Sequence, residues 1–170
     1  MVDTITSEHR SWVMSRIRSS DTTPERVVRS LLHRLGYRFS LRRKNLAGTP
    51  DIVLRKYKTV IFVHGCFWHR HPGCKQASNP KSRTKFWREK FQRNVARDER
   101  NQCELRKQGW NVIVAWECEI KSDPVAAVLD IVRRFDPERG GGVSYDELPD
   151  GRECLKVAEK RMRYTLGKKG

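Results

Sequence analysis

Apolar side chains recur at helical spacing near the start of the chain. Within residues 23–36 they fall at intervals of three and four on one face, and Gly36 ends the pattern. The run Thr23-Pro24-Glu25 is typical of an N-cap followed by a first helical turn. The pattern therefore predicts an amphipathic helix that begins at Thr23 and ends at Gly36.

Continuous apolar runs predict the strands of the same domain. Residues 51–63 contain two such runs around a basic turn, which favours a pair of adjacent strands, and 110–116 forms a third run. Between them, 84–108 has the length and periodicity of a long helix, and Pro124 begins a last core helix. Elements in this order predict an α/β domain with a mixed central sheet between helical layers.

Composition changes on both sides of this core, which we place at residues 23–135. Residues 1–22 form a polar N-terminal segment with scattered apolar side chains. From Asp136 the chain turns rich in proline and glycine and then basic, which predicts a linker and an appended tail at 136–170. Two expectations for this tail stay open, disorder and a short helix near 156–163.

The charge balance indicates the kind of partner. The 170 residues include 36 Lys+Arg against 20 Asp+Glu, a net charge of +16. Such a surface attracts polyanions, and nucleic acid is favoured because each neutralised phosphate releases counterions. A basic surface that only keeps the protein in solution is the alternative.

Targeting signals and cysteines indicate the compartment. No apolar run approaches the ~20 residues of a membrane-spanning helix, and the N-terminus lacks the apolar core of a signal peptide. Five cysteines without a secretory signal favour a reducing environment, where thiols bind metal more often than they form disulfides. We therefore expect a cytoplasmic protein that makes no membrane contact and associates with the nucleoid when bound to DNA.

The densest group of candidate functional residues lies within 50–74. Asp51 opens the first apolar run, and the second run leads directly into histidines, thiols and two aromatic rings. Hydrolytic metal chemistry needs carboxylate and imidazole held at the end of a rigid strand. A compact set of cysteine and histidine ligands is a usual way to fix such a loop. The segment predicts an enzyme site with its own structural clamp.

The clamp has the spacing of a zinc site. Cys66, His71 and Cys74 supply three ligands, and Cys118, just past the third strand, could supply the fourth if the second and third strands are parallel neighbours. A closed Cys3His site is structural rather than catalytic. The alternative is that Cys66 and Cys118 are small buried hydrophobes. A zinc deaminase is disfavoured because its His-x-Glu and Pro-Cys-x-x-Cys signatures are missing.

The long helix carries an aspartate on its inward face. Asp98 lies three residues beyond Val95, on the apolar side of the helix. An inward carboxylate is costly unless it is paired. A structural salt bridge would explain it, but His64 and His69 favour an Asp–His pair, which sets the imidazole tautomer for acid/base catalysis.

Large aromatic rings flank the proposed ligands. Phe67 and Trp68 follow Cys66 directly, and Trp87 opens the long helix among basic residues. Packing beneath the clamp is one interpretation. The other is a wedge that inserts between base pairs, since rings combined with positive charge hold unstacked DNA.

Several sequence blocks in order resemble one known family, the very-short-patch (Vsr-type) mismatch repair endonucleases of the restriction-endonuclease-like superfamily. The resemblance covers about residues 8–135. The matching blocks are 14–21 leading to Glu25, Gly48-Thr49-Pro50-Asp51, 60–71, 83–87, 94–98 and 109–118.

The resemblance implies a restriction-endonuclease-like core and a magnesium-dependent nick in duplex DNA. The nick would fall 5′ to the thymine of a T:G mismatch, made by a monomer, and would start the repair of deaminated 5-methylcytosine. Asp51 and the backbone carbonyl of Val63 would hold Mg²⁺. His69 would be the general base or acid, oriented by Asp98. The remaining catalytic groups, in contact with metal-bound waters, would be His64 and Glu25.

The same resemblance implies roles for the clamp and the rings. A structural Zn²⁺ would lie on Cys66, His71, Cys74 and Cys118. Three rings would intercalate beside the mismatch, and two side chains of residues 1–22 would support them from the other groove, which makes 1–22 a DNA-contacting segment. The DNA-contacting side chains would be Phe67, Trp68, Trp87, Met14 and Ile17.

The chain departs from the family pattern in three places. Val63 stands where threonine is expected, Pro72-Gly73 replaces a histidine-rich stretch, and the last thirty-five residues lie outside the resemblance. Two alternatives stay open from the sequence. One is a zinc-stabilised protein that binds distorted DNA without cleaving it, and the other is a related nuclease of different specificity.

Overall fold

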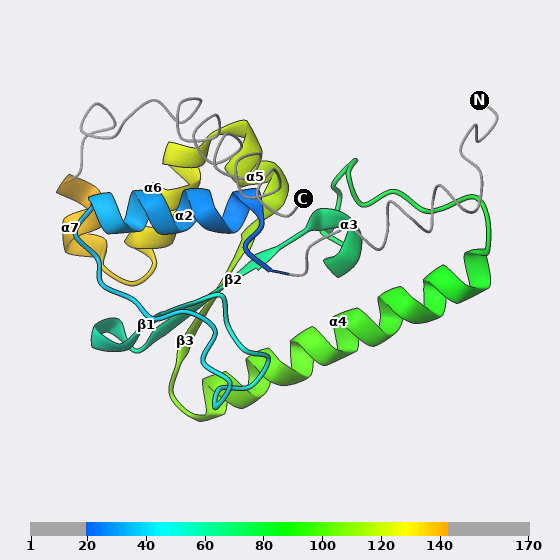
Figure 1. Cartoon of the computed structure of the whole chain (residues 1–170), viewed down its shortest axis with the longest axis horizontal. Coiled ribbons are helices and arrows are strands. Elements are labelled where there is room, and N and C mark those ends of the chain that lie inside the picture. Colours follow the sequence, from blue (N-terminus) through cyan, green and yellow to red (C-terminus); the bar gives the residue numbers. More distant parts are fainter. Residues whose placement is uncertain (1–19, 143–170) are drawn as a thin grey trace, which may run out of the picture.

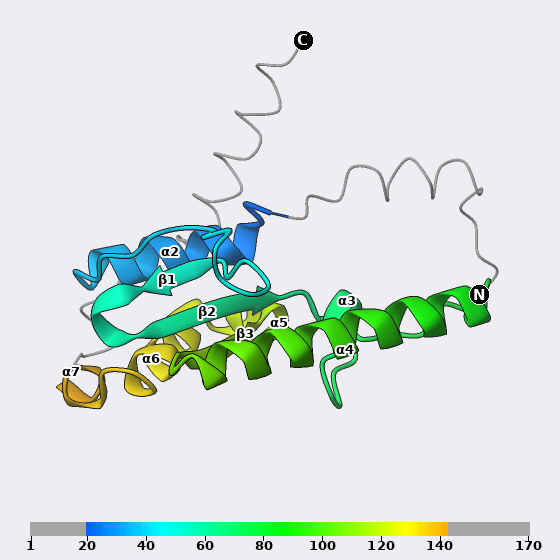
Figure 2. The same cartoon turned by 90° about the horizontal axis from the view of Figure 1, so that it is seen from below.

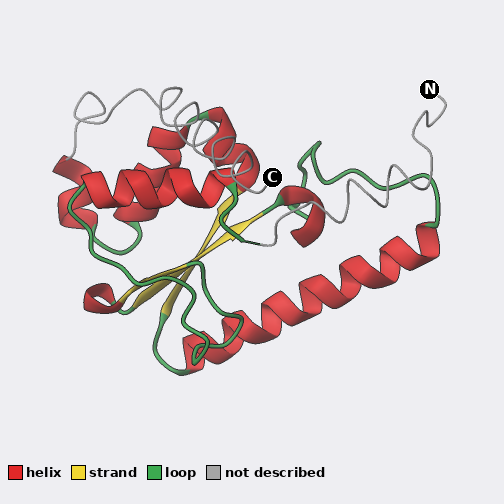
Figure 3. Cartoon of the chain, viewed as in Figure 1, coloured by secondary structure: helices red, strands yellow, loops and turns green. Residues whose placement is uncertain are grey.

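The centre of the protein is a three-stranded mixed sheet with helices on both faces (Figures 1 and 3). A computed structural model describes residues 20–142. Met14 and Ile17, and the short helix expected near 156–163, lie outside the described residues. Within the described part, none of the helices combines the length and apolarity that crossing a bilayer needs.

The strand order is β1-β2-β3. β1 (Ile52–Leu54) runs antiparallel to β2 (Thr59–His64), and β2 runs parallel to β3 (Asn111–Trp116). The predicted strand pair and third strand are confirmed. Because β2 and β3 are parallel and β1 is antiparallel, the start of β1 meets the ends of β2 and β3 at one edge of the sheet.

Alternation of side chains divides the core between the two faces of the sheet. One face packs against α2 (Thr23–Arg34), α5 (Glu117–Ser122) and α6 (Pro124–Arg133), and the other receives Leu105 of α4 (Thr84–Lys107). The two views place α2 and α4 on opposite sides of the strands (Figures 1 and 2). The predicted mixed sheet between helices is confirmed.

The first half of α4 extends past the sheet and lies beside α3 (Cys66–His69), a single helical turn that follows β2 (Figure 1). This extension holds the end of β2, α3 and α4 close together. The catalytic and metal-binding candidates lie at this junction.

Three local features differ from the sequence prediction. The N-cap of α2 is Thr22 rather than Thr23. A capping box places Glu three residues after the N-cap, and Glu25 stands three residues after Thr22. A short helix, α5, follows β3 directly. The sequence predicts a linker from residue 136, whereas Pro137–Gly142 forms helix α7. A 3-10 turn at Arg55–Tyr57, between β1 and β2, completes the list of elements.

Packing against α6 explains α7. A side chain at Gly140 would come within 2.9 Å of the Arg133 backbone, so glycine allows the close approach of the two helices. Tyr37 donates a hydrogen bond to Asp136, and Arg139 lies over the Tyr37 ring. These tertiary contacts stabilise a helix in a stretch whose glycine content predicts none.

Candidate active site and metal centre

A cavity of about 810 Å³ opens at the sheet edge where β1 begins and β2 ends. Its wall is built from the start of α2, the loop before β1, the end of β2, α3 and one face of α4. The predicted catalytic residues all line it, and they are Glu25, Asp51, His64, His69 and Asp98. Val63 lines it as well.

Asp51 is held rigidly at this edge. The backbone N–H of Val63 donates to its Oδ2 at 2.8 Å, so the antiparallel pairing of β1 with β2 fixes the carboxylate. Burial raises the pKa of Asp51 to about 6, against the hydrogen bond from Val63, and the neighbouring charge of Glu25 raises it further. A carboxylate in this position gains from a bound cation.

The donor atoms here fit a hard divalent cation. Asp51 and Glu25 offer carboxylate oxygens, and the end of β2 offers backbone carbonyls, which are the ligand types that Mg²⁺ prefers. A strand edge also keeps such oxygens in place without help from flexible loops.

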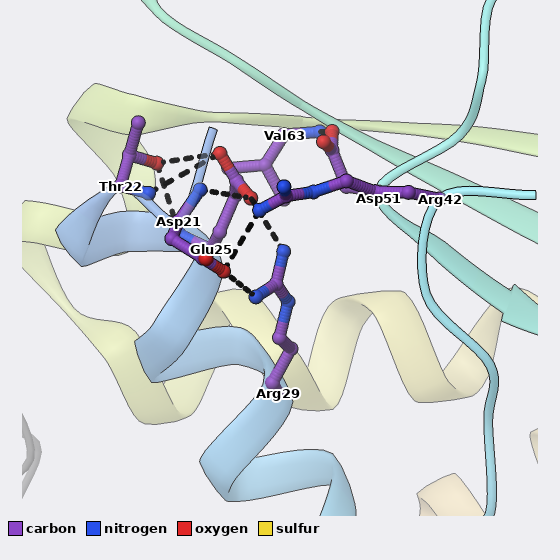
Figure 4. Close-up of polar contacts among 7 residues, drawn as sticks. All are labelled: Asp21, Thr22, Glu25, Arg29, Arg42, Asp51 and Val63. Atoms are coloured by element: carbon purple, nitrogen blue, oxygen red, sulfur yellow. Dashed lines mark hydrogen bonds and ion pairs between the residues drawn. The ribbon is translucent and has the colours of Figure 1, made fainter. Parts of the chain in front are cut away.

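Glu25 lies buried at the first turn of α2 (Figure 4). Its Oε1 accepts from the Thr22 hydroxyl at 2.9 Å, and its Oε2 accepts from Arg29 at 2.5 Å. The capping box and the ion pair therefore fix the side chain that the sequence placed near the metal. Arg29 was not predicted as its partner, although the i,i+4 spacing of Glu25 and Arg29 is a visible signal for an ion pair.

His69 and Asp98 form a direct pair across the cavity. His69 Nδ1 lies 2.5 Å from Asp98 Oδ2. Burial alone would raise the pKa of Asp98, but the hydrogen bond and charge of His69 hold it below its usual value. Asp98 accepts at Nδ1, so Nε2 is the ring nitrogen left for proton transfer. The predicted Asp–His pair is present.

His64 stacks on His69, with ring centroids 3.9 Å apart. Burial, followed by the nearby charge of His69, lowers the pKa of His64 to about 3. His64 is therefore a neutral hydrogen-bonding group at neutral pH. The ligand atoms of His64, His69 and Asp98 are close enough to hold a cation. However, His69 Nδ1 and Asp98 Oδ2 already bind each other through their short hydrogen bond.

Four Cys/His side chains converge beside the active site. The ligand atoms of Cys66, His71, Cys74 and Cys118 all lie within 4.8 Å of one another. His71 Nδ1 is 3.7 Å from the Cys66 sulfur and 3.2 Å from the Cys118 sulfur. Tetrahedral Zn²⁺ with bonds of about 2.0–2.3 Å separates its ligands by roughly 3.3–3.8 Å, which is close to these two distances, so the arrangement fits such an ion.

The fold explains how these residues meet. Cys66 follows β2 and Cys118 follows β3, and the parallel pairing of these strands brings both thiols to one edge, as the spacing predicts. His71 stacks on Trp116 at 4.2 Å, which orients its ring. Burial raises the pKa of the Cys66 thiol to about 12, and a cation is what favours the thiolate there.

Removing one ligand tests the cluster. We expect Cys118→Ser to lower Tm by about 10 °C or more and to abolish bound zinc, because a metal held by four protein ligands contributes directly to folding. Cys103→Ser is the matched control, since Cys103 is an exposed thiol on α4 outside the cluster. Zinc content and Tm are measured on both variants. Equal Tm values and no zinc in either protein would contradict a structural zinc site.

The three predicted rings lie in one aromatic cluster. Phe67 meets Trp68 at 5.1 Å and Trp87 at 5.5 Å. Phe91 completes the cluster from α4, and Lys90 lies over the Trp68 ring at 5.2 Å. Trp68 also lines the active-site cavity, whereas Trp87 does not. Phe67, Trp68 and Trp87 are half-buried, so each ring packs against the others and still exposes part of its surface.

The protein is thus an α/β protein whose sheet edge carries a carboxylate and a histidine–aspartate pair in one cavity, with a Cys/His cluster beside it. A family model for the DNA mismatch endonuclease Vsr matches residues 2–76. The chain is 51% identical over 137 residues to the type II nicking enzyme V.XorIIP of Xanthomonas oryzae, covering 81% of this chain and 99% of that protein.

Two further relatives support the same family. The chain is 49% identical to the type II nicking enzyme V.NmeAIP of Neisseria meningitidis, over 74% of this chain and 89% of that protein. It is 41% identical to the DNA mismatch endonuclease Vsr of Escherichia coli, over 71% of this chain and 77% of that protein. The protein belongs to the Vsr family of DNA mismatch endonucleases.

Proposed function

We propose that this protein nicks duplex DNA 5′ to the thymine of a T:G mismatch, that it does so with Mg²⁺, and that it initiates very-short-patch repair of deaminated 5-methylcytosine. Membership in the Vsr family makes it an endonuclease acting on DNA. The proposal adds the mismatch, the metal and the roles of the residues. It also includes a monomeric enzyme with a restriction-endonuclease-like core.

One observation carries the proposal: Asp51 and the His69–Asp98 pair line a single cavity. Asp51, with the carbonyl of Val63, would hold Mg²⁺, and the metal would stabilise the charge that develops on the phosphate. His69 would move a proton at Nε2, to or from the reacting oxygen, while Asp98 keeps its ring oriented. Hydrolysis would leave one strand cut.

Two other groups would act through water. His64 stays neutral, so it would hydrogen-bond to metal-bound water rather than carry charge. Glu25, fixed by its capping box, would accept from a second water. Because the ligand at Val63 is a backbone carbonyl, replacing the expected threonine side chain by valine leaves this contact intact.

The zinc cluster would hold α3 rigid between the catalytic and aromatic residues. Cys66 precedes Phe67, Trp68 and His69 in the same turn. Phe67, Trp68 and Trp87 would insert beside the mismatch, with Met14 and Ile17 supporting them from residues 1–22. Residues 23–135 would form the nuclease core.

A nicking assay tests the function. Two duplexes that carry T:G or T:A at one position are incubated with the full-length protein, with and without Mg²⁺. We expect a single cut in the T:G duplex that depends on Mg²⁺. Binding without any cut would favour the non-cleaving protein, and equal cutting of both duplexes would favour a nuclease of different specificity.

Trp68 tests the wedge. A T:G wobble differs little in shape from a normal pair, so groove contacts discriminate by only ~1–3 kcal/mol, and opening the stack beside a weak pair adds a second test. We expect Trp68→Ala to keep its zinc, and we expect its ratio of T:G cleavage to T:A cleavage to fall at least about tenfold.

Trp110→Ala is the control for this variant, because Trp110 packs against the sheet face covered by α4, outside the aromatic cluster. Cleavage ratios and Tm are compared on the same samples. If Trp68→Ala loses Tm as Trp110→Ala does but keeps its mismatch preference, the ring is packing alone.

The raised pKa of Asp51 predicts how the metal requirement changes with pH. The folded protein binds the proton at Asp51 more tightly than the unfolded chain, so this carboxyl stabilises the metal-free fold below pH 3.8 and loses that effect as pH rises through about 6. Mg²⁺ competes with that proton. We expect the Mg²⁺ concentration for half-maximal nicking to rise as pH falls from 7.5 to 5.5, and an unchanged midpoint would contradict this.

A further inference from the structure

Two arginines meet the acids at the first turn of α2, Arg29 from α2 itself and Arg42 from the loop before β1, and they differ in exposure (Figure 4). Arg29, from α2, donates to Asp21 and to Glu25, each at 2.5 Å. Its side chain is only 11% exposed. Arg29 is therefore occupied by the two acids and sheltered from a large ligand.

Arg42 reaches the same acids from the loop before β1. Its Nη2 lies 2.8 Å from Asp21 Oδ1 and 4.0 Å from Glu25 Oε2, so its ion pair with Asp21 is the closer one. The side chain is 36% exposed and lines the active-site cavity. Its Nε is buried without a hydrogen-bond partner among residues 20–142, and the same is true of the Arg29 Nε, so this atom does not distinguish the two arginines. Arg42 differs from Arg29 in its greater exposure, 36% against 11%, and in its place on the cavity wall.

The backbone at Arg42 is unusual for a residue with a side chain. Its φ is +43°, in the left-handed region that favours glycine. Such conformations persist where the surroundings impose them, and they gather at ligand-binding sites. In this conformation Arg42 extends from its loop toward the first turn of α2 (Figure 4).

Among residues 20–142, the wall of the cavity carries few positive charges for a site that receives DNA. Two lining residues of this part of the chain carry a permanent positive charge, Arg42 and Arg97. The carboxylates that line the cavity are Glu25, Asp51, Asp98 and Glu117. A bound DNA strand brings several of its phosphates to the cavity, and a metal at Asp51 would neutralise the one being cut. The neighbouring phosphates need other cations.

We propose that Arg42 binds a phosphate of the DNA strand that occupies this cavity, next to the phosphate being cut. A guanidinium has five N–H donors, so Nη2 of Arg42 can stay on Asp21 while the exposed part of the group donates to a phosphate oxygen. Arg29 keeps Asp21 and Glu25 in place and makes no DNA contact. The inference rests on the proposed function, because it takes DNA as the ligand of the cavity.

The salt dependence of binding tests this role. Binding of the full-length protein to a T:G duplex is measured across a salt series, with Ca²⁺ in place of Mg²⁺ to keep the DNA intact. One lost phosphate contact lowers the slope of log K against log salt by about 0.9. We expect Arg42→Gln to show this change and to bind about tenfold more weakly. Arg55→Gln, at the far end of β1, removes an exposed arginine and should match the parent protein.

A phosphate scan locates the contact. Duplexes with a single neutral methylphosphonate at successive positions of the nicked strand are bound by the parent protein and by Arg42→Gln. We expect one position where the modification weakens the parent about tenfold but weakens Arg42→Gln little further, because the contact is already gone. Arg42→Lys keeps the charge and should restore most of the salt slope, which covers the case of a poorly folded glutamine variant.

The outcomes separate the two claims. Additive losses at every phosphate, with a salt slope equal to that of Arg55→Gln, would overturn the role of Arg42 and leave it as a structural ion pair with Asp21. If the parent protein fails to nick the T:G duplex in Mg²⁺ while the Arg42 results hold, the proposed function is wrong and Arg42 is still a DNA contact.

Discussion

Replacing Asp51 is expected to reduce nicking at least about a thousandfold, because the metal would lose its only charged ligand on the strand edge. Asp51→Asn is the sharpest variant, since its amide oxygen can still accept from Val63 and the local geometry is preserved. Asp51→Ala removes that bond as well. Both should bind T:G duplexes within a few-fold of the parent, because binding relies on the basic surface.

Stability provides the control for this prediction. Burial disfavours the charged Asp51, so removing the charge should leave Tm in metal-free buffer unchanged or slightly raised at pH 7.5. Added Mg²⁺ should raise the Tm of the parent and not that of Asp51→Asn. Substantial cleavage by either pure variant would exclude Asp51 as the metal-holding residue.

The strand edge could be predicted well from the sequence because each of its parts is local. An acid before one apolar run and histidines after the next are visible in one dimension, and a hairpin brings them together. The link from Cys66 to Cys118 needed one further assumption, that β2 and β3 are parallel. Their pairing in register from Thr59 to His64 satisfies it.

Contacts between distant segments were harder to predict. Arg42 meets Asp21 across twenty residues of intervening chain, and the path of the loop that carries it has no periodic signal. The contact of Phe91 with Phe67 depends on how far α4 extends beyond the sheet, which no local pattern in the sequence indicates. Helix α7 was missed for a similar reason, since Gly140 lowers helix propensity and yet permits packing on Arg133.

The histidine–aspartate pair leads to the second large effect. We expect His69→Ala to lose about 10²–10⁴ in nicking rate, the range that a positioned acid or base supplies. Asp98→Ala should lose part of that, because Asp98 orients the ring and stabilises its charged form. If the two residues act as one unit, the double variant should be no slower than His69→Ala alone.

His71 is the matched control, since it lies two residues further along the chain, just past α3, and belongs to the Cys/His cluster. His71→Ala should lose zinc and thermal stability, whereas His69→Ala should keep both and lose turnover. Nicking rate, zinc content and Tm are measured for the two variants in parallel. Loss of zinc in His69→Ala, or additive losses in the His69–Asp98 double variant, would contradict a catalytic pair, because a structural histidine predicts instability and independent sites predict additivity.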